Sequence, residues 1–211
     1  AGTGDASTSQ AALDATDQAC LAVDSRNAYG AAKRSNMLRA ARHRAPLLAT
    51  RQATQWRVPS TAWVRQQGKW VAIPTERGGW QGSQLMQNMF ALRFEEVWQP
   101  RQVVLDRGGQ ARLGYADDCH LYGPASWLAR HINFIECTLA EAGLDMQPNK
   151  CTFWAPAADR AEAQGRPVAP GVADLARHVQ RSRGGLSLLG GDAATFKEED
   201  IFVAVDREGT G

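Results

Sequence analysis

The chain has 211 residues, of which 44% are apolar and 22% charged, a composition typical of a globular protein with a sizeable core. No apolar run approaches the roughly 18 residues that a membrane-spanning helix needs, so we expect no membrane partner. The first 18 residues lack a basic stretch followed by an apolar one, which excludes a secretory signal there. Because the chain does not begin with Met, we expect a fragment or an incomplete gene model.

Basic residues are concentrated in one part of the sequence. Ten of the 24 basic residues and no acidic residue lie between Asp24 and Glu76, which leaves 14 basic against 22 acidic residues elsewhere. Such a basic block beside an acidic remainder is typical of a protein that binds a polyanion such as nucleic acid, and a solvated helix face is the alternative. The block consists of Arg26, Lys33, Arg34, Arg39, Arg42, Arg44, Arg51, Arg57, Arg65 and Lys69.

Cysteine and histidine spacing predicts neither a disulfide framework nor a zinc site. The four cysteines form no C-x-x-C pair, and the four histidines do not complete a zinc-binding pattern. We therefore expect reduced thiols and an intracellular protein.

The first half of the chain predicts a strand, a helix, a hairpin and a second helix. A buried strand ends at Asp24, and the hairpin turns at Gln67 and Gly68. The expected elements are a poorly ordered segment at residues 1–18, a strand at 20–23, a helix at 31–44, a hairpin at 61–74, and a helix capped by Ser83 that runs to about Trp98 and has Leu85, Met89 and Leu92 on one side.

The second half predicts further strands around a pair of aspartates. Asp117 and Asp118 alone separate two apolar strands, which predicts a hairpin with two carboxylates at its tip. The expected elements are strands at 103–105, 111–116 and 119–122, a helix from Pro124 to Gly143, a strand at 150–154, a linker or insertion at 156–183 with a helix near 173–181, and a strand within 184–191. This order predicts an α+β fold with a mostly antiparallel sheet and helices on one face.

Adjacent carboxylates at a tight turn repel each other unless a cation lies between them. Hard oxygen ligands of this kind suit Mg²⁺, although aspartate is also common in ordinary turns. The flanking residues decide between the two readings. Gly114-Tyr115-Ala116-Asp117-Asp118 resembles the Tyr-x-Asp-Asp box, motif C, of reverse transcriptases, and most of all the boxes of non-LTR retrotransposons and group II introns.

Four other segments resemble motifs of the same family, in the family's order. Residues 21–29, Leu-Ala-Val-Asp-Ser-Arg-Asn-Ala-Tyr, resemble motif A, and residues 79–85 with 90–92 resemble motif B. Residues 142–151 resemble motif D, and residues 185–191 resemble motif E, the primer grip. The resemblance therefore implies a polymerase palm over residues 19–155, and a motif E-like strand with the start of a thumb connection over 184–211, with the fingers truncated and the thumb largely absent.

The resemblance also implies a set of site residues. The catalytic residues are Asp24, Asp117, Asp118 and Lys150, and the three aspartates hold two Mg²⁺ ions, for which Mn²⁺ can substitute. Nucleotide binding falls to Ser25, Tyr29, Gln81 and Gly82, with Tyr29 as the residue that excludes a 2′-hydroxyl. Nucleic-acid binding falls to Arg26, Lys33, Arg34 and Trp80. The implied partners are an RNA template, a DNA primer and deoxynucleoside triphosphates, with the nucleus as the site of action.

Motif B departs from the family's usual Gln-Gly-Asp-Pro-Leu-Ser-Pro. Ser83, Gln84, Met86 and Gln87 replace the Asp, the first Pro, the Ser and the second Pro. These departures favour an alternative in which the chain is a catalytically inactive, nucleic-acid-binding remnant of a retroelement. A viral RNA-dependent RNA polymerase is disfavoured because an aromatic residue stands where a ribose-selecting Asp is expected. A magnesium-dependent nuclease does not explain the segments that resemble motifs B, D and E.

Overall fold

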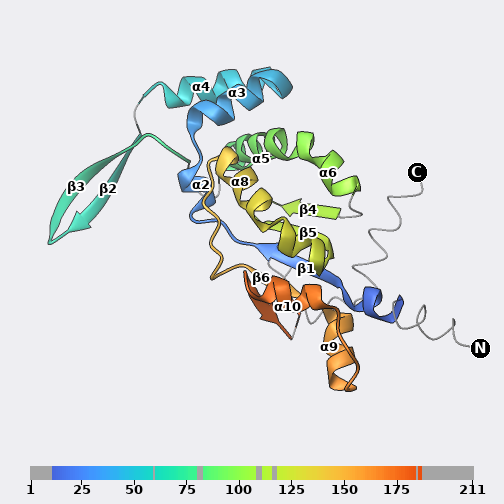
Figure 1. The fold of residues 1–211 in the computed structure, drawn as a ribbon. Coiled ribbons are helices and arrows are strands. Elements are labelled where there is room, and N and C mark those ends of the chain that lie inside the picture. The colour runs from blue at the N-terminus through green and yellow to red at the C-terminus, as the bar shows by residue number, and fades with distance from the viewer. Residues whose placement is uncertain are drawn as a thin grey trace, which may run out of the picture. The chain divides into compact units, whose positions relative to one another are not determined.

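The computed structural model describes residues 11–58, 60–79, 83–107, 111–115, 118–183 and 185–186. The chain, whose elements are labelled in Figure 1, divides by its internal contacts into two compact units. Unit 1 comprises Ala1–Asp24, Gln102–Glu136 and Met146–Gly211, and unit 2 comprises Ser25–Arg101 and Cys137–Asp145. The boundary between the units crosses residues 19–155, the segment expected to form the palm, four times.

Unit 1 is built on a five-stranded sheet. Its strand order is β4 (Ala111–Tyr115), β5 (Asp118–Pro124), β1 (Gln18–Val23), β6 (Thr152–Trp154) and β7 (Gln180–Ser182). Every neighbouring pair is antiparallel except β6 and β7, which are parallel. The fold is thus α+β with a mostly antiparallel sheet, as the order of elements in the sequence predicts.

The central strand β1 is buried because apolar residues face it from both neighbours. Leu21 pairs with Leu121 on β5 and with Phe153 on β6, and all three side chains are fully buried. On the alternate positions Cys20 pairs with Tyr122 and packs with Leu186, beside the half-buried Ala22 and Trp154. One side of these strands is therefore completely buried and the other only partly.

The structure differs from the sequence-based expectations at three places in unit 1. Within the segment expected to be poorly ordered, residues 11–16 are helical and β1 begins at Gln18. Residues 156–183, expected as a linker or an insertion, fold into α9 (Pro156–Ala163), α10 (Pro170–Ala176) and β7, and Arg181 of β7 binds Asp159 and Glu162 of α9 at 2.6 and 2.7 Å, so the segment is a folded part of unit 1. Residues 103–105 lie in a helix, α6 (Gln102–Arg107), with Leu105 buried and Val104 exposed.

The helix expected between Pro124 and Gly143 is two helices. They are α7 (Ala125–Arg130) and α8 (Ile132–Ala142), and His131 lies between them. Leu128, Ile135 and Leu139 are fully buried, as their spacing predicts. Gly143 has a φ of 90°, which suits the residue after a helix end, so its predicted role as the stop signal is confirmed.

The described part of unit 2 contains four complete α-helices, a short 3₁₀ helix, the second half of α8 and a separate hairpin. The helices are α2 (Ala28–Ala31), α3 (Arg34–Arg44), α4 (Pro46–Trp56) and α5 (Gln84–Trp98), which continues into the short 3₁₀ helix η1 (Gln99–Arg101). The hairpin consists of β2 (Ser60–Gln66) and β3 (Lys69–Thr75), which turn at Gln67 and Gly68 as predicted. Ser83 is the residue before α5, also as predicted, although its side chain makes no capping hydrogen bond.

Helix α5 supplies the core of unit 2. Its buried side chains include Met86, Met89, Phe90, Phe94 and Val97, whereas Leu85 and Leu92, expected on the buried side, are half-buried. The rings of Phe90 and Phe94 stack at 5.9 Å between centroids. The spacing of Leu85, Met89 and Leu92 therefore predicts the helix correctly, and of these three side chains Met89 is fully buried and the two leucines are half-buried.

The four cysteines are free, and they differ in burial. Cys20, Cys119 and Cys151 are buried on or beside the three central strands of the sheet, and Cys137 is exposed on α8. Burial raises the pKa of Cys20 to about 12. No helix in the described part of the chain is both long and apolar enough to cross a membrane.

Candidate functional site

The register of the central strands brings the backbone positions of two of the three predicted aspartates, Asp24 and Asp118, to one end of the sheet in unit 1. Strands β1 and β5 pair antiparallel, and the last pair before that end joins Val23 to Cys119. The next residue on β1 is Asp24 and the next on β5 is Asp118, so continuing the register by one step sets these two positions opposite each other. Opposed residues in an antiparallel pair have their Cα atoms about 4.5–5.5 Å apart.

The third predicted aspartate, Asp117, directly precedes Asp118 in the chain. Tyr115 of β4 pairs with Asp118 of β5, and Asp117 lies in the two-residue connection between them, outside the described residues. Because consecutive Cα atoms are about 3.8 Å apart, Asp117 cannot lie far from Asp118. Among the described residues no group of three or more His, Cys, Asp or Glu side chains gathers in a metal-binding arrangement.

The segment that resembles motif D is attached to Asp24 within unit 1. The backbone N–H of Gln147 donates to the carbonyl oxygen of Asp24 at 3.0 Å, and the N–H of Asp24 donates to the Sγ of Cys151 at 3.4 Å. Lys150 is exposed on the turn between these two residues, and its own N–H donates to the Gln147 carbonyl oxygen at 2.8 Å. The structure thus brings the Lys150 turn to Asp24.

Cys151 is a site residue that sequence reasoning missed. It is fully buried, and burial raises the pKa of its thiol, so the group that accepts from the Asp24 N–H is neutral. A single cysteine at the end of the segment that resembles motif D gives no sequence signal for this contact. The position becomes evident only when β6 is paired with β1.

In unit 2, Gly78 and Gly79 are bound to α2 and to Ala32, the residue after it. The N–H of Gly78 donates to the Ala32 carbonyl oxygen at 2.8 Å, and the N–H of Gly79 donates to the Tyr29 carbonyl oxygen at 3.3 Å. Gly78 has a φ of 62°, and a Cβ added there would lie 2.3 Å from the Tyr29 oxygen. Segments that resemble motifs A and B therefore touch through backbone atoms.

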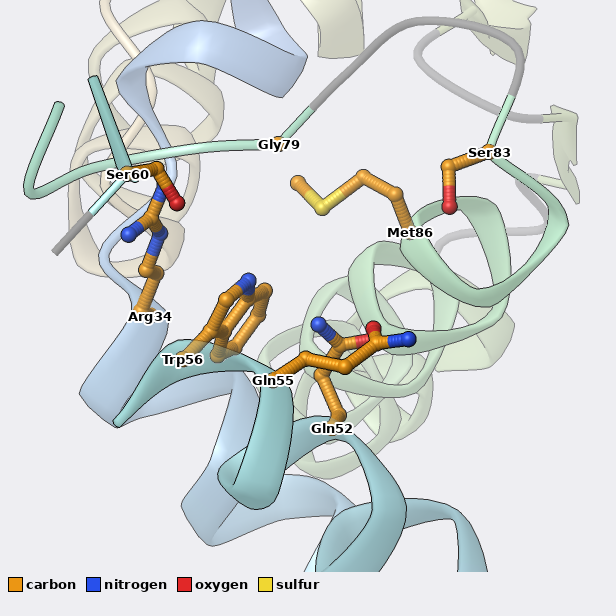
Figure 2. A pocket seen from close by; sticks show the side chains of 8 residues that line it. All are labelled: Arg34, Gln52, Gln55, Trp56, Ser60, Gly79, Ser83 and Met86. Carbon is orange, nitrogen blue, oxygen red and sulfur yellow. The ribbon is translucent and has the colours of Figure 1, made fainter. Parts of the chain in front are cut away.

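Beside this contact lies a cavity of about 170 Å³, which Figure 2 shows from close by. The Arg34 guanidinium lies 5.4 Å from the centre of the Trp56 ring, and its Nε donates to the Gly78 carbonyl oxygen at 2.8 Å. Burial lowers the pKa of Arg34 from its ordinary value. The remaining wall is largely polar and consists of Gln52, Gln55, Ser60, Gly79, Ser83 and Met86. A guanidinium stacked on an indole and flanked by carboxamides is suited to a polar or anionic group.

The other predicted residues of unit 2 are not gathered at one point. Ser25 is half-buried, and Arg26 is exposed, with its backbone N–H bound to the Asp145 carbonyl oxygen at 2.8 Å. Lys33 is exposed and forms an isolated antiparallel bridge with Arg77. Trp80, Gln81 and Gly82 lie outside the described residues. Most members of the basic block are exposed along α3, α4 and the β2–β3 hairpin.

Tyr29 is packed inside unit 2. Only 8% of it is exposed, and its ring centroid lies 4.9 Å from that of Phe90 on α5. This packing is that of a core aromatic residue, and the backbone oxygen of Tyr29 separately accepts from the Gly79 N–H.

Comparison with models of known protein families gave no match, and neither did comparison with curated proteins.

Proposed function

We propose that this chain is the palm region of an RNA-directed DNA polymerase of the non-LTR retrotransposon type, which adds deoxynucleotides to a primer 3′-hydroxyl on an RNA template. The observation that carries the proposal is the β1–β5 register, since Asp24 and Asp118 are the next residues after its last pair. They are far apart in the sequence, and each belongs to a different motif of the resemblance. The attachment of the Lys150 turn to Asp24 supports the same assignment.

The donor set fits divalent magnesium. Asp24, Asp117 and Asp118 offer hard carboxylate oxygens, which Mg²⁺ prefers, and nothing else in the sequence of this turn offsets the repulsion between adjacent aspartates. When bound, two Mg²⁺ ions supply charge neutralisation at the triphosphate and a lowered pKa for the primer hydroxyl. Lys150 then neutralises charge on the leaving pyrophosphate or donates a proton to it.

Primer extension tests the proposal. The chain is incubated with a labelled DNA primer on an RNA template, with deoxynucleotides and either Mg²⁺ or Mn²⁺, and extension is followed on a gel. Mn²⁺ binding, measured by electron paramagnetic resonance, provides a second readout that does not depend on turnover. Failure to bind Mn²⁺ at the three aspartates would exclude the two-metal assignment.

A second candidate, an inactive nucleic-acid-binding remnant, is favoured by one observation. Met86 stands where the family has a Ser, and its side chain is buried. Its Sδ lies 2.5 Å from the position that a Cβ on Gly79 would take. A bulky thioether at this point alters the loop that flanks the incoming nucleotide. Mn²⁺ binding without extension, together with retained affinity for template and primer, would support this candidate over the first.

The basic block of unit 2 is expected to bind template and primer through phosphates. Its affinity should then fall steeply with salt, with a log–log slope of roughly −0.7 to −0.9 for each phosphate contacted. Fluorescence anisotropy across a salt series measures this slope. Replacing Arg39, Arg42 and Arg51 by glutamine should reduce its magnitude, whereas an unchanged slope would assign the block to a solvated face.

Replacing Tyr29 by alanine is expected to lower the free energy of unfolding by about 3–5 kcal/mol, because it removes a buried ring that contacts Phe90. Tyr29→Phe keeps the ring and should stay much closer to the parent chain. If the ring also excludes the 2′-hydroxyl, the alanine variant should incorporate ribonucleotides about tenfold better relative to deoxyribonucleotides. Thermal melts beside the two incorporation rates separate the core role from the sugar-selecting role.

A further inference from the structure

The β2–β3 hairpin exposes an unusual amount of apolar surface. Five of the eight large hydrophobic residues that are exposed in the described part of the chain lie in this hairpin: Trp63, Val64, Trp70, Val71 and Ile73. Trp63 and Trp70 are 64% and 67% exposed. In Figure 1 the hairpin extends away from the helices to which it is joined. A concentrated exposed apolar patch of this kind marks an interaction site.

The strand register sorts these residues onto two faces. Trp63 pairs with Ala72 and Arg65 pairs with Trp70, so alternation assigns both tryptophans and Arg65 to one face. Val64 pairs with Val71, and these two lie on the opposite face with Ile73. Trp63 and Trp70 are diagonal neighbours across the strands, a relation in which large aromatic side chains are within reach of each other. The first face, which we call the tryptophan face, is therefore aromatic and basic.

Charge indicates which partner the tryptophan face suits. Arg65 is directly opposite Trp70 on the tryptophan face, Lys69 lies at the hairpin tip on the opposite face by the same alternation, and no acidic residue occurs from Ser25 to Thr75. Exposed indole rings with neighbouring cations are the arrangement that binds single-stranded nucleic acid, since unpaired bases stack on the rings and phosphates meet the cations. A duplex hides its base faces and does not offer this contact.

We propose that the tryptophan face binds single-stranded nucleic acid, with bases stacked on Trp63 and Trp70 and a phosphate at Arg65. The inference rests on the proposed polymerase function, in which the strand is the unpaired template. It assigns to this hairpin a stacking platform separate from the three aspartates.

The test compares two double variants of the whole chain. One replaces Trp63 and Trp70 by alanine, and the matched control replaces Val64 and Val71 on the opposite face by threonine. The probes are a fluorescein-labelled 20-nucleotide oligo-dT, a 20-nucleotide single-stranded RNA and a 20-base-pair DNA duplex. The tryptophan variant should bind both single strands at least about tenfold more weakly, with duplex affinity and melting temperature unchanged. The valine variant should bind all three probes within about twofold of the parent chain.

Three results would overturn the inference. They are unchanged single-strand affinity in the tryptophan variant, an equal loss of duplex affinity, and an equal loss in the valine variant. If single-strand affinity is unchanged while sedimentation shows that the parent chain is a dimer and the tryptophan variant a monomer, the face is a protein interface instead. Tryptophan-dependent single-strand binding in a chain that neither binds Mn²⁺ nor extends primers would refute the polymerase function and leave this inference standing.

Discussion

Replacing Asp24 by asparagine is expected to reduce primer extension by at least about 10²- to 10³-fold without unfolding the protein. The change removes one negative charge and keeps the side-chain shape. The contacts of Asp24 with Gln147 and Cys151 are made by its backbone and not by its carboxylate, so the end of β1 should remain in position. Asp117→Asn and Asp118→Asn are expected to have the same kind of effect.

The matched control for these variants is Asp145→Asn. Asp145 is exposed in the same segment that resembles motif D, and its backbone oxygen accepts from the Arg26 N–H. Extension rates, Mn²⁺ affinity and circular-dichroism melts are measured for each variant. The two-metal assignment is abandoned if Asp24→Asn extends primers at nearly the parent rate, or if Asp145→Asn loses as much activity as the other three variants.

Replacing Gly78 by alanine is expected to lower the free energy of unfolding by about 2–5 kcal/mol. A non-glycine residue at a φ of 62° costs about 1–2 kcal/mol by itself. The new Cβ would also lie 2.3 Å from the Tyr29 oxygen and 2.6 Å from the Gly30 Cα, so backbone on both sides must move. Such overpacking typically adds about 1–3 kcal/mol.

Gly68 provides the control for this prediction. Its φ is 79°, close to that of Gly78, but an added Cβ would have no neighbour within 4 Å. Gly68→Ala therefore carries the conformational cost alone, about 1–2 kcal/mol. Urea unfolding measures the loss of stability in both variants, and the difference between the two losses is the contribution of the Gly78 contact. Equal losses of stability would show that this contact contributes nothing.

The sequence predicted the elements that have strong local signals. The strand ending at Asp24, the hairpin that turns at Gln67 and Gly68, the helix that follows Ser83 and the stop at Gly143 all carry such signals, and all were found. These features depend on apolar periodicity and on residues with special backbone geometry. The predicted turn at Asp117 and Asp118 would pair Ala116 with Cys119, whereas the structure pairs Tyr115 with Asp118, so the hairpin was predicted and its register was not.

The sequence did not predict features that depend on distant contacts. Residues 103–105 were expected to be a strand because three apolar residues in a row do not distinguish a strand from one buried side of a short helix. The composition of residues 156–183, which is rich in alanine and proline, predicted a linker or an insertion. Small side chains such as Ala158 and Ala161 are, however, what allows α9 to pack with one side buried. The contact between Cys151 and Asp24 joins residues 127 positions apart, and no local sequence pattern predicts it.

The four thiols differ in their exposure to solvent, so the rate at which each one is modified reports on the opening of the sheet. Cys137 is open to solvent, so a thiol reagent should modify it at once, whereas Cys20, Cys119 and Cys151 are sealed within the sheet. Because Cys20 is buried between β5 and β6, and burial also raises its pKa, we expect it to react only after β1 leaves its neighbours. Counting modified cysteines by mass against time would then give the rate at which the strands that flank Asp24 separate, in the unmutated chain.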